Sequence, residues 1–271
     1  MSVFVLDELA KLNLKPTFIV TTPDKPQGRK LIMTPNVVKQ WALRHSIPVF
    51  DPAKLDSAFL DLLRSHQCDV YVVASFGRIF PEELLYIPPR KTLNIHPSLL
   101  PQYRGASPLP TAILDDTKHT GVTIMRLDKE MDHGPIVAQR EIIIDEWPTY
   151  EVFEERMARE GAQLLASILP EWINGKILER EQDHTKATYT KQISKEDGRI
   201  DLAADPYTNF RKIQAYHHWP QAYFFIEKND KNIRVKITHA SFEKGVLAIL
   251  SVIPEGGKEM PYRDFVNGYM K

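Results

Sequence analysis

The fold class is indicated most clearly by residues 47–74, IPVFDPAKLDSAFLDLLRSHQCDVYVVA. Residues 47–50 and 70–74 are short β-rich runs, and the apolar residues of 55–65 recur at the spacing of an amphipathic helix. The second run is apolar throughout, which is typical of a strand buried on both faces of a sheet. Strand, helix and strand in this order predict one unit of an α/β sheet.

The alternation of helix and strand continues upstream of this stretch. Residues 3–12 predict a helix, and residues 16–20 predict a short strand. Thr34, followed by a proline, is expected to cap a helix that ends near His45. We therefore predict the fold class α/β, with a doubly wound, mostly parallel sheet whose ligands bind at the carboxyl ends of the strands.

Downstream, the chain changes character. Thr149 is expected to cap a long amphipathic helix that breaks near Pro170. The residues that follow are polar, and the last part of the chain has one helix and then several β-rich segments. The expected organisation is a large α/β domain at 1–175, a linker at 176–205 and a small, mostly β domain at 206–271.

Composition and charge exclude several classes of protein. The 35 Lys and Arg residues balance 35 Asp and Glu residues, so the net charge does not indicate a general nucleic-acid binder. No apolar run approaches the length of a membrane helix, and the N-terminus has the pattern of an amphipathic helix rather than a leader, so we expect a cytoplasmic protein. The single cysteine, Cys68, rules out an internal disulfide and fits a reducing compartment.

Candidate catalytic residues concentrate in the stretch TLNIHPSLLPQYRGASP, residues 92–108. Alternation along a strand places Asn94 and His96 on one face, and a proline then ends the strand. Asp132 follows the next predicted strand, at 122–127, on a glycine-containing loop. An amide, an imidazole and a carboxylate at one edge of a sheet suit acyl transfer, in which an oxyanion is stabilised and a proton is moved.

Simpler interpretations of these residues stay open on spacing alone. An Asn at a strand end is commonly a turn residue, and a single His is commonly a structural polar group. Ser98 as a nucleophile is disfavoured because the Gly-x-Ser-x-Gly elbow is absent. A metal site built from His96, Asp132 and His133 is disfavoured because no metal-ligand spacing supports it, so no metal is expected.

Several motifs together are similar to those of a known family, the 10-formyltetrahydrofolate-dependent formyltransferases. The runs that carry this resemblance, in the family's order, are Asn94–Pro101, Tyr103–Gly105, Gly121–Thr123 and Met131–Gly134. Thr22–Arg29 is similar to the inserted loop of the members that formylate methionyl-tRNA. Ser194–Asp197 and Pro254–Met260 resemble the linker and the closing segment of their C-terminal, OB-like, tRNA-binding domain.

The resemblance implies a function and a site. The reaction would transfer a formyl group from 10-formyltetrahydrofolate to the α-amino group of methionyl initiator tRNA, for translation initiation. Asn94 would hydrogen-bond the oxyanion, His96 would stabilise that charge or move the proton, and Asp132 would hold His96 and a water in register. The residues implied for folate binding are Phe76, Gly77, Arg78, Ile79, Ser98, Leu99, Leu100 and Pro101. The residues implied for tRNA binding are Lys25, Arg29 and Lys30.

Two departures from the family pattern lead to expectations of their own. The family's first strand and a Gly-Thr turn would precede Val3, so we expect a sheet without that strand and a natural start upstream. The second domain is short between Ala240 and Val246, which predicts an OB-like barrel without one hairpin. A formyltransferase for a small-molecule amine, such as an amino sugar, and a non-catalytic remnant are the alternative functions. We expect a monomer in each case.

Overall fold

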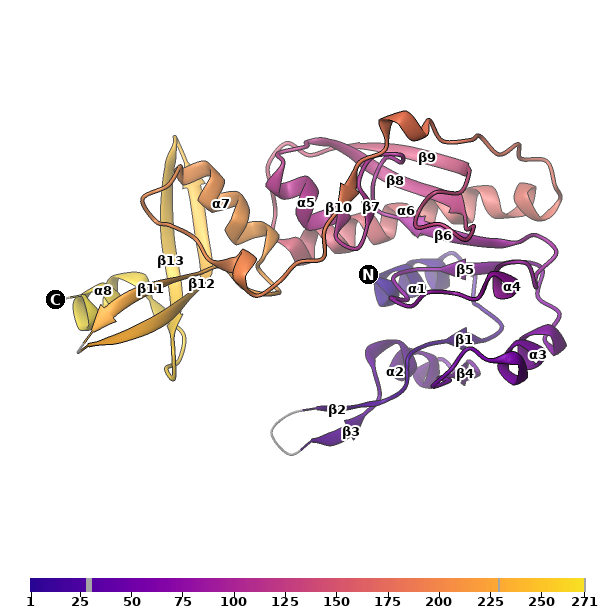
Figure 1. Ribbon diagram of the computed structural model, residues 1–271, viewed down its shortest axis with the longest axis horizontal. Helices are drawn as coiled ribbons and strands as arrows, with labels where there is room; N and C mark the ends of the chain where they lie inside the picture. The colour runs from indigo at the N-terminus through magenta and orange to yellow at the C-terminus, as the bar shows by residue number, and fades with distance from the viewer. Residues whose placement is uncertain (28–30, 229, 271) are drawn as a thin grey trace. The chain divides into compact units, whose positions relative to one another are not determined.

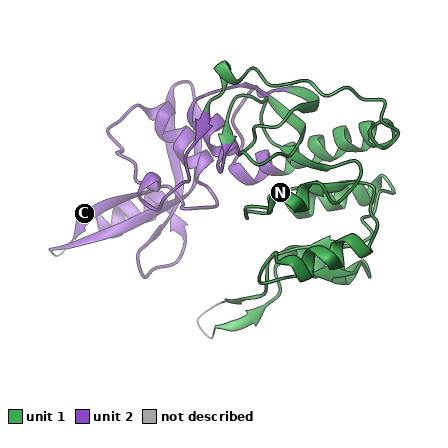
Figure 2. Ribbon diagram, turned by 45° about the vertical axis from the view of Figure 1, so that its right-hand side comes forward, with its two compact units in different colours: residues 1–104, 121–141, 155–188 green, residues 105–120, 142–154, 189–271 purple. Residues whose placement is uncertain are grey.

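The computed structural model describes residues 1–27, 31–228 and 230–270 and forms two compact units (Figure 2). Unit 1 comprises residues 1–104, 121–141 and 155–188, and unit 2 comprises residues 105–120, 142–154 and 189–271. The units therefore do not follow the order of the chain, because two internal segments group with its C-terminal part. None of the helices in the described ranges is both long and apolar enough to cross a membrane.

Unit 1 contains a two-stranded and a four-stranded sheet with helices beside them, together with a separate antiparallel strand pair (Figure 1). One sheet pairs two strands, β1 (Ile19–Val20) and β4 (Val49–Phe50), in parallel. The other has the order β5-β6-β8-β9, and its strands are β5 (Tyr71–Val73), β6 (Thr92–His96), β8 (His119–Arg126) and β9 (Ile136–Ile143). The helices are α1 (Ser2–Lys11), α2 (Val37–Arg44), α3 (Ser57–Ser65), α4 (Glu82–Leu85) and α6 (Tyr150–Ile173). An antiparallel strand pair, β2 (Lys25–Gln27) and β3 (Ile32–Thr34), precedes α2.

The predicted α/β class is confirmed, although the sheet is mixed. β5 and β6 run parallel, whereas β6 and β8 run antiparallel, with His96 opposite Thr123. The connection between β6 and β8 passes through α5 (Pro108–Leu114), which belongs to unit 2. A parallel arrangement would instead need a crossover element packed on the sheet itself.

The expectation that residues 70–74 form a strand buried on both faces is wrong. β5 is the edge strand of its sheet, and among the residues that the structure describes its one pairing partner is β6. Val72 is 39% exposed, and its neighbours Tyr71 and Val73 are half-buried. An apolar run is therefore compatible with an edge position, because the two patterns look the same in sequence.

Two expected helix boundaries differ from the structure, and one strand was not expected. α2 is capped by Asn36, whose side-chain oxygen accepts from the next residues' backbone N–H groups, while Thr34 belongs to β3. α6 continues through Pro170, which lies in its last turns, where Trp172 Nε1 donates to the Arg90 carbonyl at 2.9 Å. The loop after β8 leads into β9, a strand that the sequence analysis did not identify.

α6 lies close to the strand that carries Asn94 and His96. Figure 1 shows α6 running along the sheet, and Gly161 of this helix faces Ile95 of β6. A Cβ atom at Gly161 would lie 2.5 Å from Ile95 Cγ2, far closer than van der Waals contact. Glycine therefore permits the close approach of helix and strand that fixes β6 in the core.

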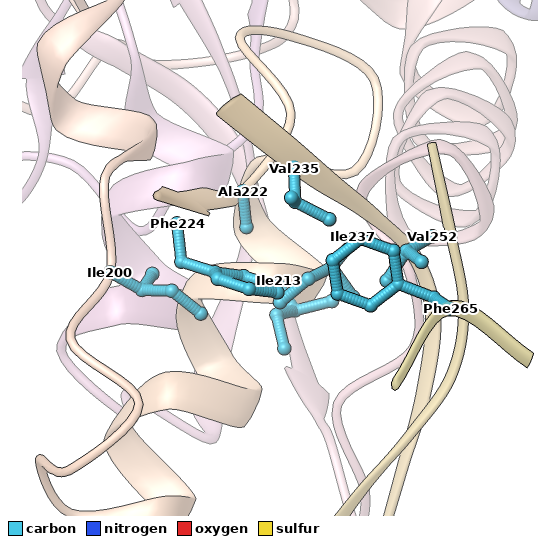
Figure 3. Packing of buried hydrophobic residues seen from close by; sticks show 8 residues of the cluster. All are labelled: Ile200, Ile213, Ala222, Phe224, Val235, Ile237, Val252 and Phe265. Carbon is cyan, nitrogen blue, oxygen red and sulfur yellow. The ribbon is translucent and has the colours of Figure 1, made fainter. Parts of the chain in front are cut away.

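Unit 2 is centred on a four-stranded sheet of order β11-β12-β13-β14. Its strands are β11 (Tyr223–Lys228), β12 (Lys231–Glu243), β13 (Val246–Pro254) and β14 (Met260–Pro261), and its pairings are antiparallel. Besides α5, unit 2 also contains α7 (Pro206–Ala215), α8 (Tyr262–Tyr269), a short strand β10 (Tyr189–Thr190), and η2 (Glu196–Gly198). Aromatic and aliphatic residues of the sheet and helices meet in one core, including Phe224, Ile213 and Phe265 (Figure 3).

Candidate active site

Asn94 and His96 lie on β6, which is paired on both edges. Asn94 is opposite Val73 of β5 and Met125 of β8, so the backbone around it is fixed from both sides. Asn94 and His96 are buried, with 9% and 4% of their residue surface exposed, respectively. Within the described part of the chain, no hydrogen bond uses the Asn94 amide, which leaves its N–H groups available to a ligand oxygen.

The two ring nitrogens of His96 have different partners. Nε2 lies 3.0 Å from the carbonyl oxygen of Tyr103, and Nδ1 lies 3.6 Å from Asp132 Oδ1. Because a carbonyl oxygen only accepts, Nε2 carries the hydrogen in this arrangement. Nδ1 then faces the Asp132 carboxylate.

The loop that carries Asp132 has an unusual backbone. Asp132 has φ +50°, in the left-handed region that non-glycine residues seldom adopt. Gly134 follows, and a Cβ atom there would lie 2.0 Å from the carbonyl oxygen of Arg126, so only glycine fits. Strained backbone of this kind persists where surrounding contacts fix it, which is common at functional sites.

Residues outside the predicted set complete this region. Gln182 is 4% exposed and donates from Nε2 to the carbonyl oxygens of Asp132 and Gly134, at 2.9 and 2.7 Å. Arg104, which is 1% exposed, donates a hydrogen bond from Nη2 to Gln182 Oε1 at 2.7 Å. Arg104 was part of the motif but had no assigned role, and Gln182 lies in a polar stretch that predicted a linker. The sequence pattern of that polar stretch does not distinguish a buried amide from an exposed one.

The residues implied for folate binding fall into two groups. Phe76, Gly77, Arg78 and Ile79 follow β5, where Phe76 stacks on Phe80 with centroids 5.1 Å apart and Ile79 is 95% exposed. Ser98, Leu99, Leu100 and Pro101 follow β6. Since β5 and β6 are parallel, both segments leave the sheet at the same edge.

Two members of the second group have structural partners. The Ser98 hydroxyl is 1% exposed and donates to the Gln102 carbonyl at 2.6 Å. Leu100 packs with Met125 and Ile136 in the core. The backbone N–H of Leu100 donates to Thr123 Oγ1, and its carbonyl accepts from Gln139.

The residues implied for tRNA binding belong to the region of β2 and β3. Lys25 is exposed on β2, whereas Arg29 and Lys30 lie outside the described residues. Lys39, a further basic residue near this region, contacts Asp24 and Asp51 at 3.0 and 2.8 Å. These contacts raise the pKa of Lys39, with the Asp51 hydrogen bond as the largest cause, so Lys39 has a structural role.

The residues considered for a metal site have other partners. His133 Nδ1 lies 2.8 Å from Asp128 Oδ2, and its ring stacks on His184 with centroids 4.0 Å apart. Over residues 1–27, 31–228 and 230–270, no three His, Cys, Asp or Glu side chains converge as metal ligands would.

Comparison with known proteins shows the family of this chain. The profile described as "Formyl transferase" matches residues 4–169, and "Formyl transferase, C-terminal domain" matches residues 192–244. The chain belongs to the formyl transferase family. Its relatives in that family include methionyl-tRNA formyltransferases, and the chain groups with these, as the sequence motifs predicted.

Three of these proteins illustrate the likeness. The methionyl-tRNA formyltransferase of Chloroflexus aggregans is 45% identical over 83% of this chain and 73% of its own length. That of Thermus thermophilus is 37% identical over 98% of this chain and 92% of its own length. The solved methionyl-tRNA formyltransferase of Clostridium thermocellum superposes with a TM-score of 0.61 at 16% identity, covering 90% of this chain and 98% of that one. The last comparison supports the fold alone.

Proposed function

We propose that this protein transfers the formyl group of 10-formyltetrahydrofolate to the α-amino group of methionyl initiator tRNA, acting as a cytoplasmic monomer. The observation that carries the proposal is the trio at β6 in a member of this family. It consists of the uncommitted amide of Asn94, the buried imidazole of His96, and the Asp132 carboxylate 3.6 Å from His96 Nδ1. Together they supply the oxyanion stabilisation and proton handling that acyl transfer requires.

Asn94 acts on the charge that develops during the reaction. The folate supplies an activated formyl group; the attacking amine bonds to the formyl carbon, and the bond from that carbon to the folate nitrogen breaks. Negative charge develops on the formyl oxygen as the amine attacks, and the Asn94 amide donates a hydrogen bond to it. The proton lost by the amine replaces the formyl group on the folate nitrogen, so the reaction balances.

His96 handles that proton. Its Nε2 hydrogen is directed at the Tyr103 carbonyl, so Nδ1 takes up and returns the proton. The Asp132 carboxylate beside Nδ1 stabilises the imidazolium formed in between. His96 is almost fully buried, and this attraction is therefore less screened by water than a surface pair would be.

The loop after β5 suits a planar ring. Phe76 offers an aromatic face, with the Arg78 guanidinium 5.9 Å from its ring centroid. Arg78 also donates to the carbonyls of Pro52 and Ala53, which anchors this loop to the chain after β4. We assign Phe76, Gly77, Arg78 and Ile79 to the folate site, with Ser98, Leu99, Leu100 and Pro101 at its other side. Leu100 and Ser98 serve there as supports, because their side chains are buried.

The tRNA has two proposed contact regions. Lys25 with Arg29 and Lys30 provides positive charge for the phosphates near the acceptor end. The domain at 206–271 provides the second region. The four-stranded sheet of unit 2 and the excess of 10 Lys and Arg residues over 6 Asp and Glu residues within 206–271 support this assignment.

The test is formyl transfer measured with two acceptors. The purified chain is given 10-formyltetrahydrofolate with methionyl initiator tRNA, and in a parallel reaction with an amino sugar. We expect formylation of the tRNA alone. Transfer to the sugar alone would support the small-molecule alternative, and folate binding without transfer to either acceptor would support the remnant. Substitution of Arg29 by Ala is expected to weaken tRNA use while folate binding is retained.

A further inference from the structure

Residues 180–188, which we call the anchor segment, run along unit 1 after α6. Near its start, Arg180 and Ile136 exchange backbone hydrogen bonds of 2.9 and 2.8 Å at the beginning of β9. At its end, the Thr188 carbonyl accepts from the Arg104 N–H at 2.9 Å. The anchor segment is thus bound to the loop after β6 and to the strand after the Asp132 loop.

The loop after β6 and the Asp132 loop each contain a residue with left-handed backbone that faces His96. Tyr103, whose carbonyl oxygen meets His96 Nε2, has φ +59°, and Asp132 has φ +50°. The anchor segment contacts both residues. The Tyr103 N–H donates to Thr188 Oγ1 at 2.8 Å, and the Asp132 carbonyl accepts from Gln182 at 2.9 Å. Each ring nitrogen of His96 therefore faces a residue that the same segment holds in place.

Of the contacts to Tyr103 and Asp132, the one made by the buried Gln182 is better shielded from solvent. Its amide nitrogen has two hydrogens, and the carbonyl oxygens of Asp132 and Gly134 accept both. The amide oxygen of Gln182 accepts two hydrogen bonds from Arg104, one from Nε at 3.2 Å and one from Nη2 at 2.7 Å. A buried amide whose hydrogen bonds are all made fixes its neighbours strongly, because losing one bond would leave a polar group unpaired.

Arg104 fixes the orientation of Gln182. A guanidinium has only N–H donors, so the amide oxygen must point toward Arg104 and the amide nitrogen toward the Asp132 loop. Because Arg104 Nη2 can only donate, His184 Nδ1, which lies 2.8 Å from it, accepts a hydrogen bond. His184 in turn stacks on His133 of the loop, so the anchor segment holds this loop by a ring contact as well.

We propose that Gln182 is a positioning residue of the reaction, holding the backbone of Asp132 so that its carboxylate stays beside His96 Nδ1. This inference rests on the proposed function, because the reaction gives the Asp132 contact its purpose. It extends that function by making part of the predicted linker a support of the catalytic trio. Gln182 itself touches neither substrate in this account.

The test combines amide hydrogen exchange with steady-state kinetics on the full chain. Gln182→Met keeps the length and removes the amide, and Glu181→Gln is the control because Glu181 is an exposed neighbour. We expect Gln182→Met to speed exchange in residues 128–134 about tenfold or more. We also expect kcat to fall about 10–100-fold, with the KM of each substrate changed by less than about threefold. Glu181→Gln should match the wild type in both measurements.

The outcomes separate this inference from the proposed function. A wild type that forms no formylated tRNA overturns the function, and the exchange measurement still decides whether Gln182 holds the loop. Unchanged exchange in Gln182→Met overturns the inference, and so does a loosened loop with unchanged kcat. A fall in activity that only matches a fall in folded fraction also overturns it. If Gln182→Met does not fold, Gln182→Asn, which keeps an amide that is too short to reach both carbonyls, is judged by the same criteria.

Discussion

β5 and β6 are parallel neighbours in one sheet, yet they differ in how far their residues are exposed to solvent. Every residue of β6 is buried, whereas β5 has an exposed Val72 and half-buried neighbours. β6 pairs with β5 on one edge and β8 on the other, and α6 covers it at Gly161. β5 lies at the edge of the sheet.

This difference would account for the position of the proposed catalytic groups. An amide and an imidazole on a strand fixed from both edges keep their positions when substrates bind, which lowers the reorganisation that the reaction requires. The loop after β5 carries exposed apolar side chains such as Ile79, which suits contact with a ligand surface. We therefore assign chemistry to β6 and binding to the end of β5.

One of the two largest expected effects comes from removing the amide on β6. Asn94→Ala should lower kcat about 10²–10³-fold, because one donor to the developing oxyanion is lost. The change should leave the Kd for folate within about threefold, because the amide acts mainly on the transition state. Single-turnover transfer and equilibrium folate binding measure the two effects. An unchanged rate would contradict the assignment of chemistry to β6.

The next effect concerns the stability of β6. Ile95 is 2% exposed and faces Gly161, so Ile95→Ala should lower the free energy of unfolding by about 2–5 kcal/mol. Urea denaturation monitored by circular dichroism measures this change. A loss below about 1 kcal/mol would show that β6 is less tightly packed than its burial indicates.

The contrast between the strands marks the limit of what sequence predicts. The β-rich runs, the helix at 55–65 and the positions of Asn94 and His96 on one strand face were all predictable from residue spacing. The edge position of β5 was not, because pairing partners come from distant segments of the chain. Gln182 was also missed, since its role depends on the carbonyls of Asp132 and Gly134. Those groups have no counterpart in a sequence pattern.

A pH-dependent effect tests the inward side of β5. Burial raises the pKa of Tyr71 to about 12 from an ordinary value of 10, with a smaller contribution from Cys68. The folded state therefore holds this proton more tightly than the unfolded state, and the stability it contributes is lost as pH rises from 10 toward 12. After allowance for solvent screening, the loss is about 1 kcal/mol.

Tyr71→Phe should remove this loss. The free energy of unfolding is measured for both proteins between pH 9 and about 11.5, and the wild type is expected to lose more stability than the variant across that range. Parallel curves for the two proteins would show that the Tyr71 hydroxyl is as accessible when folded as when unfolded.

The smallest effect is expected on the exposed side of β5. Val72 is 39% exposed, so Val72→Ala should change the free energy of unfolding by less than about 1 kcal/mol and leave formyl transfer unchanged. Urea denaturation beside Ile95→Ala gives the comparison directly. Equal losses in the two variants would remove the distinction between the strands.

Single-turnover formyl transfer to methionyl initiator tRNA is measured for the wild type and for His96→Ala, both saturated with substrates. We expect product from the wild type and a rate lowered about 10²–10⁴-fold in the variant, with the tRNA and folate still bound. Equal rates for the two proteins would contradict the catalytic role of His96. A wild type without product would contradict the proposed activity itself.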